Sequence, residues 1–240
     1  MDLRFDRYSY RARMRPALIA CAPLAVWLSL WMPTDSAGAR LAWTALFSCG
    51  VAALLPHIAR DLGGAREPSL FRSWGGPPTT RLLSHQLSPL DRVTLARHHA
   101  KLRALAPDLP LPTAAEEAAN ISAANAIYGS AIAILRERTR DHEKFSLVFE
   151  ENVSYGFRRN LWALKPFGLT FATVGLIGCM YFAAHHSGDD PKLARQATVG
   201  AAICATILAA WILIITPEWV HVAARAYADS LIGALDNIEP

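Results

Sequence analysis

The segment ATVGAAICATILAAWILIIT, Ala197–Thr216, decides the fold class of this chain. Its 20 residues include no Lys, Arg, Asp or Glu. A bilayer core of ~30 Å needs ~20 apolar residues at a helical rise of ~1.5 Å per residue. Because a segment in lipid must satisfy its own backbone hydrogen bonds, it must be a helix. Three more charge-free segments of similar length accompany it: Pro16–Met32, Leu41–Ala59 and Pro166–Ala184.

The four apolar segments form two closely spaced pairs around a polar middle. A charge at the bilayer centre costs at least ~2.5 kcal/mol. Four charge-free windows in a chain with 24 Lys and Arg and 20 Asp and Glu therefore indicate membrane insertion. We predict an all-α integral membrane protein with four transmembrane helices in two hairpins and a cytoplasmic helical insert. The predicted parts are a basic segment with the first hairpin (1–59), the insert (60–165), the second hairpin (166–216) and a C-terminal tail (217–240).

The basic residues predict the orientation of the chain. Five arginines precede the first apolar segment and fifteen Lys or Arg lie in Arg60–Lys165, whereas the short linkers inside each pair carry few. The positive-inside rule then places both termini and the insert in the cytoplasm. A cleaved signal peptide ending near Ala37-Gly38-Ala39 is the alternative. The apolar run before it is longer than the usual ~7–15 residues, which favours a retained anchor.

Charge and secondary-structure patterns describe the insert. Fifteen basic residues against eleven acidic ones is a small excess. It favours membrane lipid as a partner, and we expect no nucleic acid. The Gly- and Pro-rich stretch Arg60–Thr80 predicts a loop. Three helices are predicted to follow: Ser88–Ala106, Thr113–Thr139 with a capping box at Glu116, and one from Asp141 to Lys165.

The stretch LFRSWGGPPTTRLLSH, Leu70–His85, is the first candidate site. Consecutive glycines allow close backbone approach to a ligand, and hydroxyl and guanidinium groups beside them suit a phosphate. The alternative is a tight turn that Trp74 plugs. The candidate residues for binding a ligand or partner are Trp74, Gly75, Gly76, Thr79, Thr80 and Arg81.

The stretch FEENVSYGFRRNLWALK, Phe149–Lys165, is the second candidate site, because it leads directly into an apolar segment. Its polar residues suit either a gate near the membrane entrance or contacts with lipid head groups. Ion pairs between Glu and Arg on one helix face are the alternative. The candidate residues are Asn152, Tyr155, Arg158, Arg159 and Asn160.

Metal and cofactor signals are weak in this sequence. His185, His186, Asp189 and Asp190 offer four ligand atoms in a short linker, but a polar loop explains them equally. We expect no metal, no cofactor and no catalytic residue, since no Ser-His-Asp, Cys-His or HExxH arrangement is present.

Small residues recur at helical spacing in the third and fourth apolar segments. Such positions let helices approach closely, in one chain or between chains. They are Gly175 and Gly178, and the series Ala201, Ala205 and Ala209.

The strings ARDLGGAREPSLFRSWGGPPTTRLLSH (Ala59–His85) and EENVSYGFRRNLWALKP (Glu150–Pro166) resemble segments of an uncharacterised family of four-span bacterial membrane proteins. The resemblance implies a multi-pass protein of the bacterial inner (plasma) membrane. The layout is also similar to that of membrane effectors of bacterial defence systems, although architecture does not assign function. We therefore predict a membrane-embedded interaction or effector protein that forms a pore on a cytoplasmic trigger, with a protein partner or a homo-oligomer. The alternative is an enzyme or sensor that binds a phosphorylated small molecule or lipid through Leu70–His85.

Overall fold

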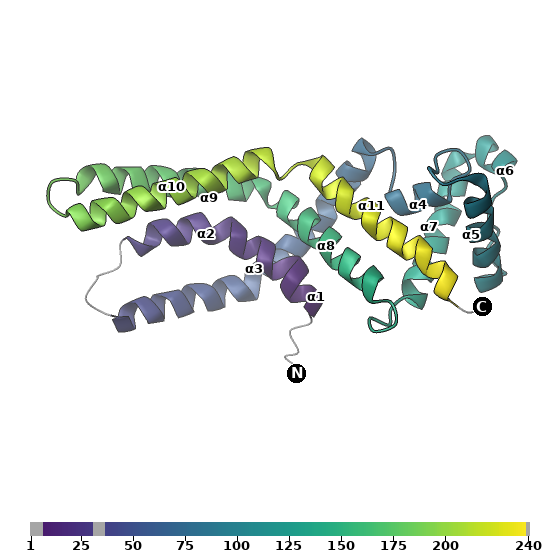
Figure 1. Cartoon of the computed structure of the whole chain (residues 1–240), viewed down its shortest axis with the longest axis horizontal. Coiled ribbons are helices and arrows are strands. Elements are labelled where there is room, and N and C mark those ends of the chain that lie inside the picture. The colour runs from purple at the N-terminus through teal and green to yellow at the C-terminus, as the bar shows by residue number, and fades with distance from the viewer. Residues whose placement is uncertain (1–6, 31–36, 239–240) are drawn as a thin grey trace. The chain divides into compact units, whose positions relative to one another are not determined.

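The computed structural model describes residues 7–30 and 37–238, without the side chains of Arg7, residues 37–53 and Leu55. Within these ranges the chain consists of helices joined by short turns, with no β-strand (Figure 1). The predicted all-α fold class is therefore confirmed.

The chain divides into two compact units. Unit 1 comprises Met1–Glu67 and Gly156–Val220, and unit 2 comprises Pro68–Tyr155 and His221–Pro240. Unit 2 thus combines most of the predicted insert with most of the predicted C-terminal tail, two parts that the sequence suggested were separate.

Each unit has its own set of helices. Unit 1 contains α1 (Arg7–Ser9), the π-helix η1 (Tyr10–Met14), α2 (Arg15–Ser29), α9 (Lys165–His185) and α10 (Pro191–Leu213). Unit 2 contains α4 (Pro78–Leu83), α5 (Arg92–Leu105), α6 (Ala114–Ala119), α7 (Ile121–Arg138) and the 3₁₀-helix η2 (Ala234–Asn237). Three helices have residues in both units: α3 (Ala37–Ser73), α8 (Ser146–Ala163) and α11 (Pro217–Gly233).

Two described helices, α9 and α10, are long and apolar enough to cross a membrane, with 21 and 23 residues. The helix α9 contains the whole predicted segment 166–184. The helix α10 contains most of the predicted segment 197–216, but it ends at Leu213, three residues before that segment does. The helix α2 has 15 residues, fewer than the ~17 that a bilayer core requires. The second predicted segment lies in α3, where most side chains are outside the described part. The two N-terminal spans therefore stay predictions.

Glycines allow α9 to lie close to α2 and α10. A Cβ atom added at Gly168 would lie 2.2 Å from the Trp211 ring of α10. A Cβ added at Gly178 would lie 2.2 Å from Nε1 of Trp27 in α2. No side chain larger than hydrogen fits at such distances, so these glycines set the spacing of the three helices.

The predicted small-residue positions divide between the inside and the outside of unit 1. Gly175 packs against Pro23 of α2, with 2.7 Å from its added Cβ to the Pro23 carbonyl oxygen. On α10, Ala205 and Ala209 are exposed, whereas Cys204, which directly precedes Ala205, is fully buried. Close approach within the chain therefore uses the glycines of α9, and part of the alanine series faces outward.

The predicted loop Arg60–Thr80 is wrong over most of its length, because α3 continues as a helix to Ser73. Gly and Pro weaken helices by ~1 and ~3 kcal/mol per residue, which is why the sequence predicted a loop. Packing overrides that preference here. Ala59 and Leu70 are buried, and a Cβ at Gly63 would lie 2.1 Å from Oδ1 of Asn160. The break in the chain is confined to the turn before α4.

The helices of unit 2 begin and end at capping residues. The predicted capping box at Thr113 and Glu116 is confirmed, but Asn120 ends α6 and caps α7, so 113–139 is two helices. Asp91 accepts from the backbone N–H groups of Val93 and Thr94, both at 2.9 Å, and starts α5 later than predicted. A side-chain oxygen that satisfies free N–H groups fixes the first residue of a helix.

Candidate functional site

The turn between α3 and α4 is closed by its own residues. Gly75 and Gly76 have φ values of +73° and +121°, which only glycine adopts without strain. The Gly76 N–H donates to the Phe71 carbonyl at 2.8 Å, and the Arg81 guanidinium donates to the Trp74 carbonyl. The Trp74 ring is nearly parallel to that of His221, with 4.6 Å between centroids.

The two threonines after this turn face inward. Thr79 and Thr80 are 6% and 9% exposed, and the Thr80 hydroxyl donates to the Pro77 carbonyl at 3.0 Å. The structure therefore brings the six candidate residues together, and it gives Arg81 and Thr80 partners within the turn. This geometry matches the tight turn plugged by Trp74, and phosphate binding by the stretch stays a prediction.

The end of the same stretch forms a buried polar network with Glu117 of α6, which is 3% exposed. The Glu117 carboxylate accepts hydrogen bonds from the Ser84 hydroxyl, from the His85 N–H at 2.7 Å and from the Tyr128 hydroxyl at 2.8 Å. One carboxylate thus joins α6, α7 and the residues that follow α4.

Two histidines extend this network. Nε2 of His99 in α5 lies 2.8 Å from the Leu83 carbonyl oxygen, and its ring meets that of His85 edge-on at 4.6 Å. Nε2 of His85 lies 3.1 Å from the Pro112 carbonyl oxygen. The network therefore reaches four helices of unit 2. Ser84 is only 1% exposed, so its bond to Glu117 lies inside unit 2 and joins the helices there.

Hydrogen bonding and burial set the protonation states of the network. Burial favours the neutral form of Glu117, but the hydrogen bonds from Ser84, His85 and Tyr128 outweigh it and lower the pKa. Burial, followed by the bond to Glu117, raises the pKa of Tyr128, so its phenol stays a donor. Burial also lowers the pKa of His99, which favours its neutral form. Glu117 is accordingly a buried carboxylate stabilised as an anion by neutral donors.

The second candidate site divides between the two units. Arg158, Arg159 and Asn160 belong to unit 1, and Asn152 and Tyr155 belong to unit 2. Within unit 2, Tyr155 is buried and its ring is parallel to that of Tyr227 at 6.2 Å, while Asn152 is half-buried. The structure thus groups three of the five predicted residues.

The three grouped residues hold helices of unit 1 together. The Arg158 guanidinium lies over the Trp219 ring at 4.9 Å and donates to the Trp219 carbonyl at 2.9 Å. Arg159 pairs with Glu67 of α3 at 3.0 Å, and both side chains are mostly buried. Asn160 is 1% exposed and donates to the Ala12 carbonyl of η1 at 2.7 Å. These contacts differ from the predicted ion pairs along one helix face, because Arg159 pairs with Glu67 of a different helix and Arg158 contacts Trp219. The gate stays a prediction.

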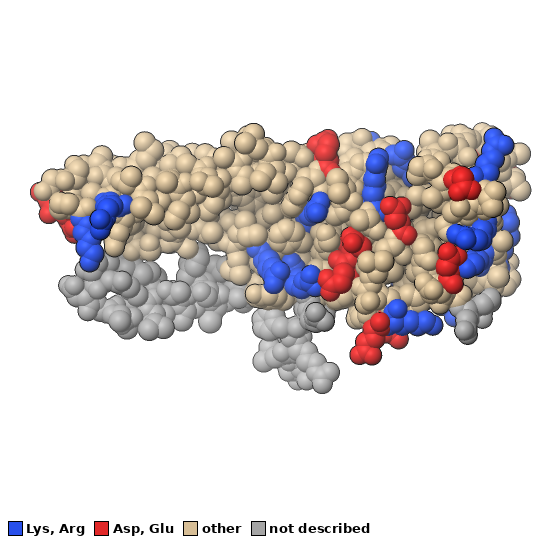
Figure 2. Space-filling view, viewed as in Figure 1, with Lys and Arg blue, Asp and Glu red and all other residues tan. Residues whose placement is uncertain are grey.

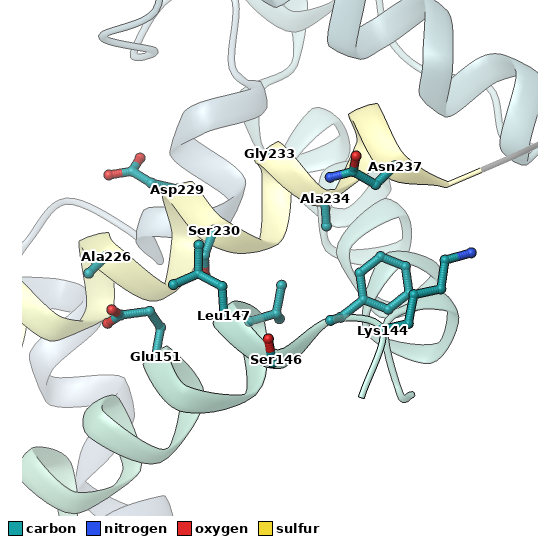
Figure 3. Close-up of a pocket in the computed structure, with 12 residues that line it drawn as sticks. Lys144, Ser146, Leu147, Glu151, Ala226, Asp229, Ser230, Gly233, Ala234 and Asn237 are labelled. Atoms are coloured by element: carbon teal, nitrogen blue, oxygen red, sulfur yellow. The ribbon is translucent and has the colours of Figure 1, made fainter. Parts of the chain in front are cut away.

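A groove of about 520 Å³ lies in unit 2 between the start of α8 and the end of α11 (Figure 3). The carboxylates of Glu151 and Asp229 lie at one end, and Lys144 and Asn237 lie at the other. Apolar and small residues line the part between them: Phe145, Leu147, Val148, Ala226, Gly233 and Ala234.

The sequence did not predict this groove, because its two walls lie about eighty residues apart in the chain. The available signal was the spacing of Ala226, Ser230 and Gly233, which places small residues along one face of the tail helix. A helix face of small residues leaves room for another chain, but only the fold shows that α8 forms the opposite wall.

No group of three or more His, Cys, Asp or Glu within the described residues could hold a metal ion. His186 instead lies 3.2 Å through Nδ1 from the Phe182 carbonyl oxygen, and Asp190 caps α10. Comparison with known proteins gave no match of significance: no family model, no curated protein and no solved structure matches the chain.

Proposed function

We propose that this chain is a membrane-embedded interaction protein, in which unit 1 lies in the bilayer and unit 2 binds a protein partner. One observation carries the proposal. Only 28% and 22% of the most apolar windows of α9 and α10 are buried inside the protein. In a water-soluble protein, helices of this composition are core helices and are mostly buried.

The exposed side chains of these helices are large and apolar. Ile177 and Met180 of α9 are 62% and 58% exposed, and Leu213 at the end of α10 is 74% exposed. In Figure 2, the visible surface of α9 and α10 is free of charge except near the turn that joins them. A surface of this kind is stable in lipid, where burial of apolar groups inside the protein is not required.

The four-span arrangement in two hairpins is part of this proposal. Leu18 and Ile19 on α2, and Leu54 and Ile58 on α3, also expose apolar side chains. With four spans and the arginine-rich start of the chain, both termini and unit 2 lie in the cytoplasm of a bacterial cell. Lys165 supports the boundary at this side, because its Nζ lies 2.8 Å from the carbonyl oxygen of Ile215, two residues after α10 ends.

The most specific form of the proposal is an oligomer that forms a pore when unit 2 binds its partner. The outward positions of Ala205 and Ala209 on α10 support it, because small residues allow helices of neighbouring copies to approach closely. Unit 2 is suited to transmit a binding event, because the Glu117 network makes its helices a connected frame.

The experiment that tests the proposal uses the full chain expressed in bacteria. After alkaline washing, the protein should stay with the membranes. Single cysteines at Asp108 and Gly188, placed in a variant without native cysteines, should react from the cytoplasmic and the outer side respectively. A protein released by the wash, or a Gly188 position labelled only from the cytoplasm, contradicts the proposal. Size-exclusion chromatography in mild detergent tests the oligomeric form of the proposal. A strict monomer without a bound protein contradicts that form.

A further inference from the structure

We propose that the groove between α8 and α11 binds a short peptide segment of a protein partner that carries lysine or arginine next to leucine-like side chains. The proposed function leads us to expect a partner for unit 2. The residues that line the groove determine the chemistry of the segment that it binds (Figure 3).

The charged end of the groove selects a cation. Glu151 and Asp229 project from different helices toward the same end. Burial raises the pKa of Asp229, while Arg225 acts in the opposite direction. Asp229 nevertheless remains exposed to solvent, so a cationic side chain can approach its carboxylate and favour the charged form. A lysine or arginine side chain that binds at this end lies near two negative charges.

The middle of the groove selects an apolar side chain. Phe145 and Val148 are buried and form part of its lining, whereas Leu147 is 65% exposed. On the α11 side, Ala226 and Gly233 leave space because their side chains are small. A leucine-like residue bound there would remove both its own surface and that of Leu147 from water, which favours binding.

The length of the groove suits a peptide segment. Asp229 and Asn237 mark its two ends on the α11 side. Four α-helical steps of ~1.5 Å and four 3₁₀ steps of ~2.0 Å separate them by about 14 Å. That distance corresponds to about two and a half helical turns or four extended residues of a ligand. Grooves between two helices bind peptide segments through apolar anchors with charges at the rim.

Charge complementarity also gives the bound segment a direction. Its basic residue lies at Glu151 and Asp229, and its carbonyl or carboxylate oxygens lie toward Lys144 and Asn237. A segment with acidic residues at the first end would meet two like charges and bind poorly.

The test uses the full chain in a neutral maltoside detergent and a fluorescein-labelled peptide of nine leucine and lysine residues. Binding is measured by fluorescence anisotropy, with a leucine–glutamate peptide as the control ligand. The double variant Glu151→Gln, Asp229→Asn should bind the leucine–lysine peptide at least about tenfold more weakly than the wild type. Higher salt should weaken binding of this peptide to the wild type by a similar factor.

A second variant fills the groove without disturbing the fold. A Cβ added at Gly233 meets no atom within 4 Å, so Gly233→Leu places a side chain in the groove and should also weaken binding at least about tenfold. Gly129→Leu is the matched control, because a Cβ at Gly129 on α7 has the same free space outside the groove. It should bind the peptide as the wild type does.

Any one of three results overturns the inference. The wild type does not bind the leucine–lysine peptide, or it binds the leucine–glutamate peptide equally well, or the two groove variants bind the leucine–lysine peptide as tightly as the wild type does. The membrane and labelling experiments do not involve these residues. A chain that inserts with the proposed topology but fails the peptide test would therefore exclude the groove alone. A chain that is released from membranes but binds the peptide would exclude the proposed membrane function alone.

Discussion

Glu117→Gln is the substitution that tests the internal frame of unit 2 most directly. Three donors converge on the carboxylate: the Ser84 hydroxyl, the His85 N–H and the Tyr128 hydroxyl. A glutamine offers one oxygen and adds an N–H₂ group, so at least one buried donor loses its acceptor. Hydrogen bonds to a charged group contribute ~1.5–3 kcal/mol, and an unsatisfied buried donor costs ~1–3 kcal/mol. We expect the free energy of opening of unit 2 to fall by about 3 kcal/mol.

Hydrogen exchange followed by mass spectrometry measures this loss within unit 2. A change of about 3 kcal/mol corresponds to roughly 100-fold faster exchange of amides in α6 and α7. The neighbouring variant Glu116→Gln is the control, since Glu116 is exposed and a capping box accepts glutamine at this position. If both variants exchange at the same rate, the network does not stabilise unit 2.

The pH dependence of the same exchange gives an independent check on Glu117. Its pKa is lower in the folded chain than in the unfolded chain. The stabilisation is therefore present above the unfolded pKa of ~4.3 and is lost as the pH falls through the folded pKa. The wild type should lose this protection in acid, and the Glu117→Gln variant should lose less, because the contribution of Glu117 is absent from it.

Three further experiments test other parts of the structure. Gly168→Leu should destabilise the packing of α9 by at least about 1–3 kcal/mol, measured by thermal unfolding in detergent, while Gly188→Leu in the open turn should have little effect. The folded pKa of His99 is lowered, so stability should be complete above its unfolded value of ~6.5 and decrease as the pH falls below it; His99→Gln should reduce this decrease in an exchange experiment. A double-mutant cycle of Arg159→Met and Glu67→Gln should give a coupling of about 1–2 kcal/mol in unfolding experiments, because this ion pair is only partly exposed; a coupling near zero would mean that the pair does not hold α3 and α8 together.

Local signals in the sequence predicted the capping residues of unit 2 but not their partners. Thr113 and Glu116 were predictable because a capping box needs only residues three apart. Glu117 is next in the sequence and has a different role, because its donors lie 11 to 33 residues away. The sequence contains no spacing that relates Ser84 to Glu117, so the buried network was not predictable.

Tertiary packing also decided the course of α3. The Gly and Pro residues between Arg60 and Thr80 predicted a loop from local preference. The helix continues because Ala59, Gly63 and Leu70 lie against other helices, and the close fit of Gly63 to Asn160 needs a residue without a side chain. A glycine required for packing and a glycine required for a turn look alike in the sequence. Gly75 and Gly76, a few residues later, are turn glycines.

The sequence by itself determined the all-helical class and the two apolar helices α9 and α10, because composition and length along one segment are sufficient to define such helices. The tertiary structure alone decided which polar groups are buried, which glycines set helix spacing, and that α8 and α11 form a groove. These features depend on residues that are distant in the chain and adjacent in space. Their positions follow from packing of whole helices, which no local pattern of residues records.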